Sequence, residues 1–145
     1  MRDGLTGLPE RHTLQRRLSE LVTRAGKSEL PVALLLIDLN RFEEINHGLG
    51  HEYGDLLLQQ VASRLRAVSR EGDLIGRVGD DEFALILPNT TMAAAMGCIR
   101  KVQSALRAPF VVLGARLNVR ARVGAALSPQ HATEPDLLYT RADTA

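Results

Sequence analysis

The sequence predicts an α+β fold: a ferredoxin-like βαββαβ core with an antiparallel central sheet flanked by helices, plus an extra β-hairpin. Three observations predict it. Strand-like and helix-like runs follow one another in the order α, β, α, α, β, β, α, β, β, α. The pair Gly79-Asp80 separates two apolar runs, which is a signal for a tight hairpin. At 145 residues and 45% apolar content, the chain is long enough for one domain with a buried core.

The N-terminal half is predicted to hold three helices around one buried strand. Pro9 stands where the first turn of a helix is expected, and leucines then recur at helical spacing up to a glycine stop. Residues 32–39 form a continuous apolar run that only Asp38 interrupts, which is typical of a central strand covered on both faces. A short helix over 41–47 and a longer amphipathic helix after Gly50 follow.

The C-terminal half is predicted to hold two hairpins separated by a helix. The helical run is rich in alanine, and the second hairpin alternates apolar and polar residues around a glycine turn. The predicted elements are strands over 74–78 and 83–87, a helix over 92–107, strands over 110–112 and 116–127, and a last helix from 136.

Composition limits the class of protein. Eighteen basic and 17 acidic residues give a net charge of +1, so bulk charge predicts no nucleic-acid partner. No apolar run reaches the roughly 20 residues that span a bilayer, so we expect no direct membrane contact from this segment. The single cysteine, Cys98, allows no internal disulfide, which suits a cytoplasmic domain, including one carried by a membrane-anchored receptor. The abrupt chain ends predict a piece of a larger multidomain protein.

Carboxylates gather at the first predicted hairpin. Asp81 and Glu82 directly follow the Gly79-Asp80 turn. Asp38 lies near the end of the central strand, and in a ferredoxin-like sheet that end lies beside the hairpin tip, so three carboxylates can converge on one point. A cluster of hard oxygen ligands favours Mg²⁺. The alternatives are a solvated acidic turn and a helix-capping role for Asp38.

Polar residues also flank the junction between the two middle helices. They are Asn46, His51 and Asp55. Such groups either serve a ligand or satisfy the backbone amides of two helix ends.

Four stretches form ordered motifs with specific spacing. Residues 3–11 resemble D-x-L-T-G-L-x-N-R, and residues 36–42 resemble a strand with D-x-D-x-F. Residues 45–55 resemble I-N-D-x-x-G-H-x-x-G-D, and residues 77–83 stand where R-x-G-G-D-E-F belongs. Together these motifs resemble the GGDEF domain, the diguanylate cyclase domain of bacterial signalling proteins.

The resemblance covers essentially the whole chain. It implies a single domain over residues 1–145, with a shortened C-terminal helix, in a fold like that of nucleotide cyclases and polymerase palms. Residues 110–129 are most similar to GGDEF domains that precede an EAL phosphodiesterase domain in hybrid proteins. The resemblance therefore implies an EAL domain as a partner in the same chain.

The resemblance also implies a reaction, in which two GTP molecules are joined into cyclic di-GMP with release of pyrophosphate. Each domain of a homodimer would supply one GTP. Two Mg²⁺ ions would screen the triphosphate and stabilise the leaving group. The implied residues are Asp38, Asp81 and the Leu39 carbonyl for metal, Asp81 and Glu82 for catalysis, Asn46 and Asp55 for guanine, and Phe42, Gly79 and Asp80 as further nucleotide contacts.

A second ligand site is implied by Arg70 and Asp73. They stand five residues before the hairpin turn, at the offset of the family's R-x-x-D inhibitory site for cyclic di-GMP. An arginine can fork onto a phosphate or a guanine edge, and the aspartate can accept from guanine. The alternative is an ion pair of little energetic value at the surface.

The sequence departs from the family pattern at several site positions. Asp80 replaces the second glycine, where the hairpin backbone would lie close under the nucleotide. Glu43 stands in place of a phosphate-contacting lysine, a contact worth about 1 kcal/mol in water and about 4 kcal/mol at an effective dielectric constant of 20. Asn40 and His47 replace aspartates, and Arg122 replaces a serine without a functional explanation from the sequence.

These departures predict a degenerate GGDEF domain with weak or no cyclase activity. We expect it to bind GTP, cyclic di-GMP or both, and to regulate an adjacent EAL-type domain. One alternative is an active diguanylate cyclase. The other is a dimerisation or interaction module that binds no nucleotide.

Overall fold

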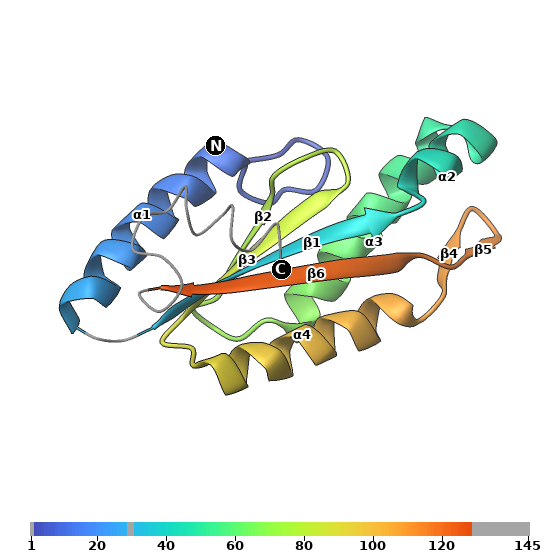
Figure 1. Ribbon diagram of the computed structural model, residues 1–145. Helices are drawn as coiled ribbons and strands as arrows, with labels where there is room; N and C mark the ends of the chain where they lie inside the picture. The colour runs from blue at the N-terminus through green and yellow to red at the C-terminus, as the bar shows by residue number, and fades with distance from the viewer. Residues whose placement is uncertain (1, 29–30, 129–145) are drawn as a thin grey trace.

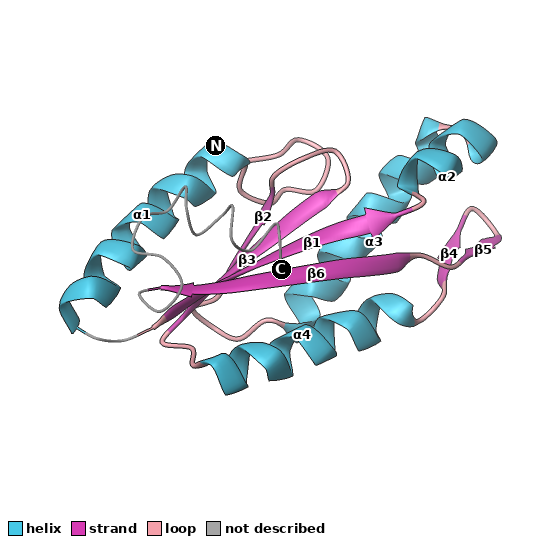
Figure 2. Cartoon of the chain, in the orientation of Figure 1, coloured by secondary structure: helices cyan, strands magenta, loops and turns pink. Residues whose placement is uncertain are grey.

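The computed structural model describes residues 2–28 and 31–128 and shows one central sheet with helices on both faces (Figure 1). The helices and strands alternate along the chain much as the sequence predicts (Figure 2). The elements are α1 (Arg11–Ser28), β1 (Val32–Asn40), α2 (Phe42–Leu49), α3 (His51–Val68), β2 (Leu74–Arg77), β3 (Glu82–Pro88), α4 (Met92–Arg107), β4 (Phe110–Val112), β5 (Ala115–Leu117) and β6 (Arg120–Ser128).

The main sheet has four strands in the order β2-β3-β1-β6. Each neighbouring pair runs antiparallel. With α3 between β1 and β2, and α4 between β3 and β6, this is the βαββαβ arrangement. The predicted fold class is confirmed.

The central strand β1 is covered on both faces, which is why its sequence is an uninterrupted apolar run. Leu35 and Ile37 belong to the core under α3 and α4. Leu34 and Leu36 point to the other face and pack with Leu14 and other side chains of α1. Full burial of one such side chain contributes about 1.5–3 kcal/mol to the stability of the fold. Because β1 contributes buried side chains to both faces, the cores on the two sides of the sheet both depend on this strand.

Arg64 of α3 fastens the C-terminal end of α4. Its guanidinium donates hydrogen bonds to the carbonyls of Ala105, Ala108 and Pro109 at 2.9, 2.6 and 2.7 Å. It also lies 3.5 Å from the centre of the Phe110 ring. The last carbonyls of a helix have no partner within the helix, and Arg64 satisfies one of them, at Ala105, together with the two carbonyls that lead into β4.

Two predicted elements differ from the structure. The run 116–127 is not one strand paired with 110–112: β4 pairs only with β5, and β6 pairs with β1 along nine positions from Asn40↔Arg120 to Val32↔Ser128. Alternation within the run continues on both sides of the break, so the local pattern could not reveal the change of partner. The first helix begins at Arg11, so Pro9 lies before it, in an isolated bridge with Arg2, and not in its first turn. The helix also continues past Gly26, its predicted stop, to Ser28. The last predicted helix, from 136, lies outside the described residues.

No helix within residues 2–28 and 31–128 is both long enough and apolar enough to cross a bilayer.

Candidate functional site

The predicted carboxylates lie at one end of the main sheet. Asp38 is opposite Glu82 in the β1–β3 register and opposite Arg122 in the β1–β6 register. The backbone amide of Leu39 donates to the carbonyl oxygen of Asp81 at 3.1 Å. This bond fastens the hairpin tip to the end of β1, so the predicted meeting of these two segments is confirmed.

Asp81 lies in a field of negative charge. Partial burial raises the pKa of its carboxyl group, and the charges of Asp38, Glu43 and Glu82 raise that pKa further, against a backbone hydrogen bond that lowers it. The carboxylates therefore destabilise one another in the ionised form. A cation at this end of the sheet would relieve that repulsion.

The expectation that three carboxylates converge on one point is not met. Within residues 2–28 and 31–128, no three His, Cys, Asp or Glu side chains are grouped closely enough to hold a metal ion. Asp38 has a cationic neighbour instead: Arg122 Nη2 lies 3.4 Å from Asp38 Oδ2. However, Mg²⁺ is usually held by one or two carboxylates, with waters and substrate phosphates filling the other positions. Asp38, Asp81 and the Leu39 carbonyl fit that pattern of hard oxygen donors.

A second polar site lies where α2 meets α3. Asn46 Oδ1 is buried and has no hydrogen-bond partner among the described residues. The side chain lies directly against the backbone of Gly54: a Cβ atom there would be 2.9 Å from Asn46 Cγ and closer still to Oδ1. An unpaired buried acceptor costs about 1–3 kcal/mol. Asn46 Oδ1 is thus an uncompensated polar atom, and a side chain at residue 54 would displace it.

The other residues predicted to contact nucleotide differ in exposure. Asp55 is exposed on α3, next in sequence to Gly54, and the turn residues Gly79 and Asp80 are exposed at the hairpin tip. Phe42 is buried at 5% exposure, and its ring lies beneath the same glycine, with Cζ 3.2 Å from the position of a Cβ on Gly54. The Phe42 side chain therefore supports the Asn46 site from the core, and only its backbone is left for ligand contact.

Comparison with known proteins places the chain in a family. The family described as "Diguanylate cyclase, GGDEF domain" matches residues 1–145. The chain belongs to the GGDEF family. This GGDEF domain is a module of cyclic di-GMP signalling, in agreement with the motifs in its sequence.

Relatives from Pseudomonas aeruginosa share sequence and structure with this GGDEF domain. It is 39% identical over 145 residues to the diguanylate cyclase TpbB, covering 99% of this chain and 33% of TpbB. It is 34% identical over 145 residues to MucR, a bifunctional diguanylate cyclase/cyclic di-GMP phosphodiesterase, covering 100% of this chain and 21% of MucR. A solved structure of TpbB comprising only the GGDEF domain matches with a TM-score of 0.95 at 38% identity, over 99% of this chain and 84% of that one. The chain thus spans a third or less of the length of these two curated relatives.

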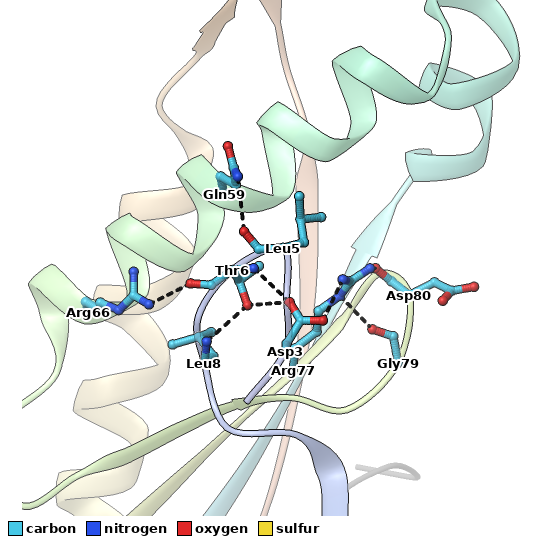
Figure 3. A network of polar contacts seen from close by, with 9 residues as sticks. All are labelled: Asp3, Leu5, Thr6, Leu8, Gln59, Arg66, Arg77, Gly79 and Asp80. Carbon is cyan, nitrogen blue, oxygen red and sulfur yellow. Dashed lines mark hydrogen bonds and ion pairs between the residues drawn. The ribbon is translucent and has the colours of Figure 1, made fainter. Parts of the chain in front are cut away.

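The hairpin is held in place by a network that the sequence did not predict (Figure 3). Arg77 Nη1 donates to Asp3 Oδ1 at 3.1 Å, while its Nε and Nη2 donate to the carbonyls of Gly79 and Asp80 at 3.2 and 2.8 Å. The Asp80 side chain points away from Arg77 (Figure 3). One guanidinium therefore ties the N-terminal loop to both residues of the turn. The sequence held one sign of this contact: the D-x-L-T motif, which begins at Asp3, occurs together with the R-x-G-G-D-E-F motif, which begins at Arg77.

The same N-terminal loop is attached to α3. Asp3 Oδ2 accepts hydrogen bonds from the backbone amide and the hydroxyl of Thr6 at 2.8 and 2.7 Å. Gln59 and Arg66 of α3 donate to the carbonyls of Leu5 and Thr6 at 3.0 and 2.8 Å. Burial alone would raise the pKa of Asp3, but the Thr6 hydrogen bonds and the Arg77 charge together hold it below its ordinary value. The loop thus connects the hairpin to the helix that carries Gly54.

Arg70 and Asp73 are paired with each other. Asp73 Oδ1 lies 3.1 Å from Arg70 Nη2, and Asp73 Oδ2 accepts from the backbone amide of Arg70 at 2.8 Å. The Asp73 side chain is only 3% exposed, and Arg70 also donates to the Thr90 hydroxyl at 2.9 Å. The hydrogen bond and charge of Asp73 raise the pKa of Arg70. The geometry is that of the ion-pair alternative, so a ligand that used Asp73 would first have to open this pair.

Proposed function

We propose that this GGDEF domain binds GTP with Mg²⁺ and turns it over weakly or not at all. Its role would then be to regulate an adjacent domain of the EAL phosphodiesterase type. The observation that carries the binding proposal is the buried, unpaired Asn46 Oδ1 against Gly54, beside the exposed Asp55. Amide and carboxylate groups recognise the donor and acceptor pattern of guanine.

The Mg²⁺ ions would be held by Asp38, Asp81 and the carbonyl of Leu39. When bound, they would screen the triphosphate and stabilise the pyrophosphate leaving group. Asn46 and Asp55 would orient the base, and Glu82 would support the metals or the 3′-hydroxyl. Arg77 already holds the turn of the hairpin that carries Asp81.

Two side chains support the proposal of weak turnover. Glu43 stands in place of a phosphate-binding lysine, and its charge reaches Asp81, whose pKa it helps to raise. Repulsion between unit charges about 4 Å apart costs roughly 1 kcal/mol in water and about 4 kcal/mol at an effective dielectric constant of 20. Asp80 adds a further exposed carboxylate at the hairpin tip.

The regulatory role is supported by the relatives. MucR combines cyclase and phosphodiesterase activities in one chain, and this domain covers only part of such a protein. GTP bound here would stabilise one arrangement relative to the neighbouring domain, and cyclic di-GMP at Arg70 and Asp73 would provide a second input. A ligand can shift such an equilibrium only by its difference in affinity for the two arrangements.

An active diguanylate cyclase is the second candidate. It is favoured by the intact set Asp38, Asp81 and Glu82 at one end of the sheet, and by the identity to TpbB, which is a diguanylate cyclase. In that case two copies would meet as a homodimer, each presenting one GTP. Cyclic di-GMP formed from GTP and Mg²⁺, and abolished by Asp81→Ala, would establish this candidate in place of the regulatory one.

Calorimetric titration of the full-length protein with GTP and Mg²⁺ tests the proposed binding. We expect saturable binding that Asp55→Ala weakens and that Glu52→Ala, a matched removal of an exposed acidic residue on the same helix, leaves within about twofold. Hydrogen bonds to charged groups contribute about 1.5–3 kcal/mol, so the Asp55 loss should be roughly 10- to 150-fold. A folded protein that binds neither GTP nor cyclic di-GMP would refute the proposal.

A further inference from the structure

We propose that β6 supplies the cationic contact for the polyphosphate of the bound nucleotide, through Arg120 and Arg122. This inference rests on the proposed nucleotide binding and extends it to residues that the GGDEF motifs do not include. It also gives Arg122 a role that its position in the sequence did not explain.

The sheet register places both arginines beside the end of β1. Arg122 is opposite Asp38, and Arg120 is opposite Asn40. Because residues two apart on a strand point to the same face, the two guanidinium groups share one face with Asp38. They form the β6 side of the end of β1, while Glu82 on β3 forms the other side.

The ion pair between Arg122 and Asp38 is weak enough for either side chain to take another partner. The two side chains are 69% and 37% exposed, and they are joined by a single contact of 3.4 Å. Exposed pairs of this type contribute little to stability. A cation on Asp38 would therefore release the Arg122 guanidinium for an anion bound at the same end of the sheet.

Arg120 lines two clefts. One, of about 380 Å³, is lined by Asn40, Arg41, Asn118 and Arg120. The other, of about 400 Å³, lies toward α4 and is lined by Gln103, Arg107, Val119, Arg120 and Ala121, so only the first cleft adjoins the end of β1. Throughout the described ranges 2–28 and 31–128, the guanidinium groups of Arg41, Arg107 and Arg120 form no ion pair or hydrogen bond. Arg41 and Arg120 line the same cleft, and unpaired positive charges that share a cleft attract anions.

A polyphosphate bound at the end of β1 would need a cation that the neighbouring residues do not supply. The site next to it already contains the carboxylates of Asp38, Glu43 and Asp81, which repel phosphate, and residue 43 supplies no cation. Arginine forks match phosphate oxygens in geometry as well as charge. The first cleft is lined by Asn40 at the end of β1 and by Arg41, the residue directly before α2, which carries Asn46. A nucleoside di- or triphosphate is the ligand that combines a base at Asn46 with phosphates at β6.

The test measures affinity against the number of phosphates. The full-length protein and the double variant Arg120→Ala/Arg122→Ala are titrated with GMP, GDP and GTP in the presence of Mg²⁺. Since one charge contact changes affinity roughly fivefold in water, we expect GTP to bind about 10- to 100-fold more weakly to the double variant. GMP should bind within about twofold, and Arg116→Ala, which removes an exposed arginine of β5, should change no affinity.

The outcomes separate this inference from the proposed function. If the unmodified protein binds none of the three nucleotides, nucleotide binding itself is refuted. If it binds GTP and the double variant binds GTP equally well, only the role of β6 is refuted. An equal loss for GMP and GTP would show that the arginines act on the fold or the base site and would also overturn the inference. The circular dichroism spectrum should stay unchanged in the double variant because both side chains are exposed.

Discussion

Gly54→Ala separates the proposed role of Asn46 in GTP binding from its place in the fold. The new Cβ would lie 2.9 Å from Asn46 Cγ and 3.2 Å from Phe42 Cζ, and closer still to Asn46 Oδ1. The Asn46 amide is the flexible end of a side chain, so it can swing away, whereas the Phe42 ring must give by only a few tenths of an ångström. We therefore expect the protein to fold with Asn46 displaced from its site.

The expected loss of stability is small because two effects oppose each other. Overpacking costs typically about 1–3 kcal/mol, while alanine in a helix is about 1 kcal/mol more favourable than glycine. The net free energy of unfolding should fall by about 0–2 kcal/mol. The affinity for GTP should fall more, by about 5- to 150-fold, because hydrogen bonds worth about 1–3 kcal/mol are lost.

Thermal unfolding and GTP titration of the same preparation check both numbers. Gly48→Ala is the matched control: it is also a helical glycine near this junction, and no atom lies within 4 Å of its added Cβ. That variant should keep its GTP affinity and should be as stable as the unmodified protein or slightly more so. A folded Gly54→Ala protein with unchanged GTP affinity would refute the role of Asn46 in reading the base.

Three further predictions concern the Arg77 network and the Arg70 pair. Arg77→Met should lower the free energy of unfolding in urea by about 1–3 kcal/mol, since the part-buried Asp3 Oδ1 loses its guanidinium partner. Arg116→Met should not lower it, and equal stability of both variants would contradict this. Because the folded state lowers the pKa of Asp3, its contribution is present above the ordinary value of 3.8 and is lost as the pH falls through the lower folded-state value. Asp3→Asn should therefore destabilise at pH 7 and lose its effect in acid, and a pH-independent difference would contradict the assignment. Asp73→Asn should weaken the hold on Arg70, and native-state hydrogen exchange should show faster opening around the Arg70 turn; unchanged exchange would contradict the closed pair.

Local patterns were sufficient for most of the fold. The apolar run of β1 and the alanine-rich run of α4 predict their elements because the signal lies within a single stretch of about ten to fifteen residues. The β6 segment shows where this fails. Its alternation predicted a strand, but the choice between β4 and β1 as partner depends on the whole sheet.

The sequence predicted which residues lie at the candidate site, but it did not predict most of the contacts between them. Asp38 and Asp81 were placed together because the βαββαβ order dictates which strand ends meet. The Asp3–Arg77 pair joins residues 74 positions apart, and no periodicity connects them. The closure of Arg70 onto Asp73 and of Arg122 onto Asp38 depends on side-chain conformations that spacing alone does not determine.

The central claim is that this GGDEF domain keeps its GTP site while its turnover is impaired. It is tested most directly by titrating the full-length protein with GTP and Mg²⁺ in a calorimeter and then separating the nucleotides of that sample by chromatography. We predict saturable binding of GTP and little or no cyclic di-GMP. Rapid accumulation of cyclic di-GMP, or no binding by a folded protein, would contradict the claim.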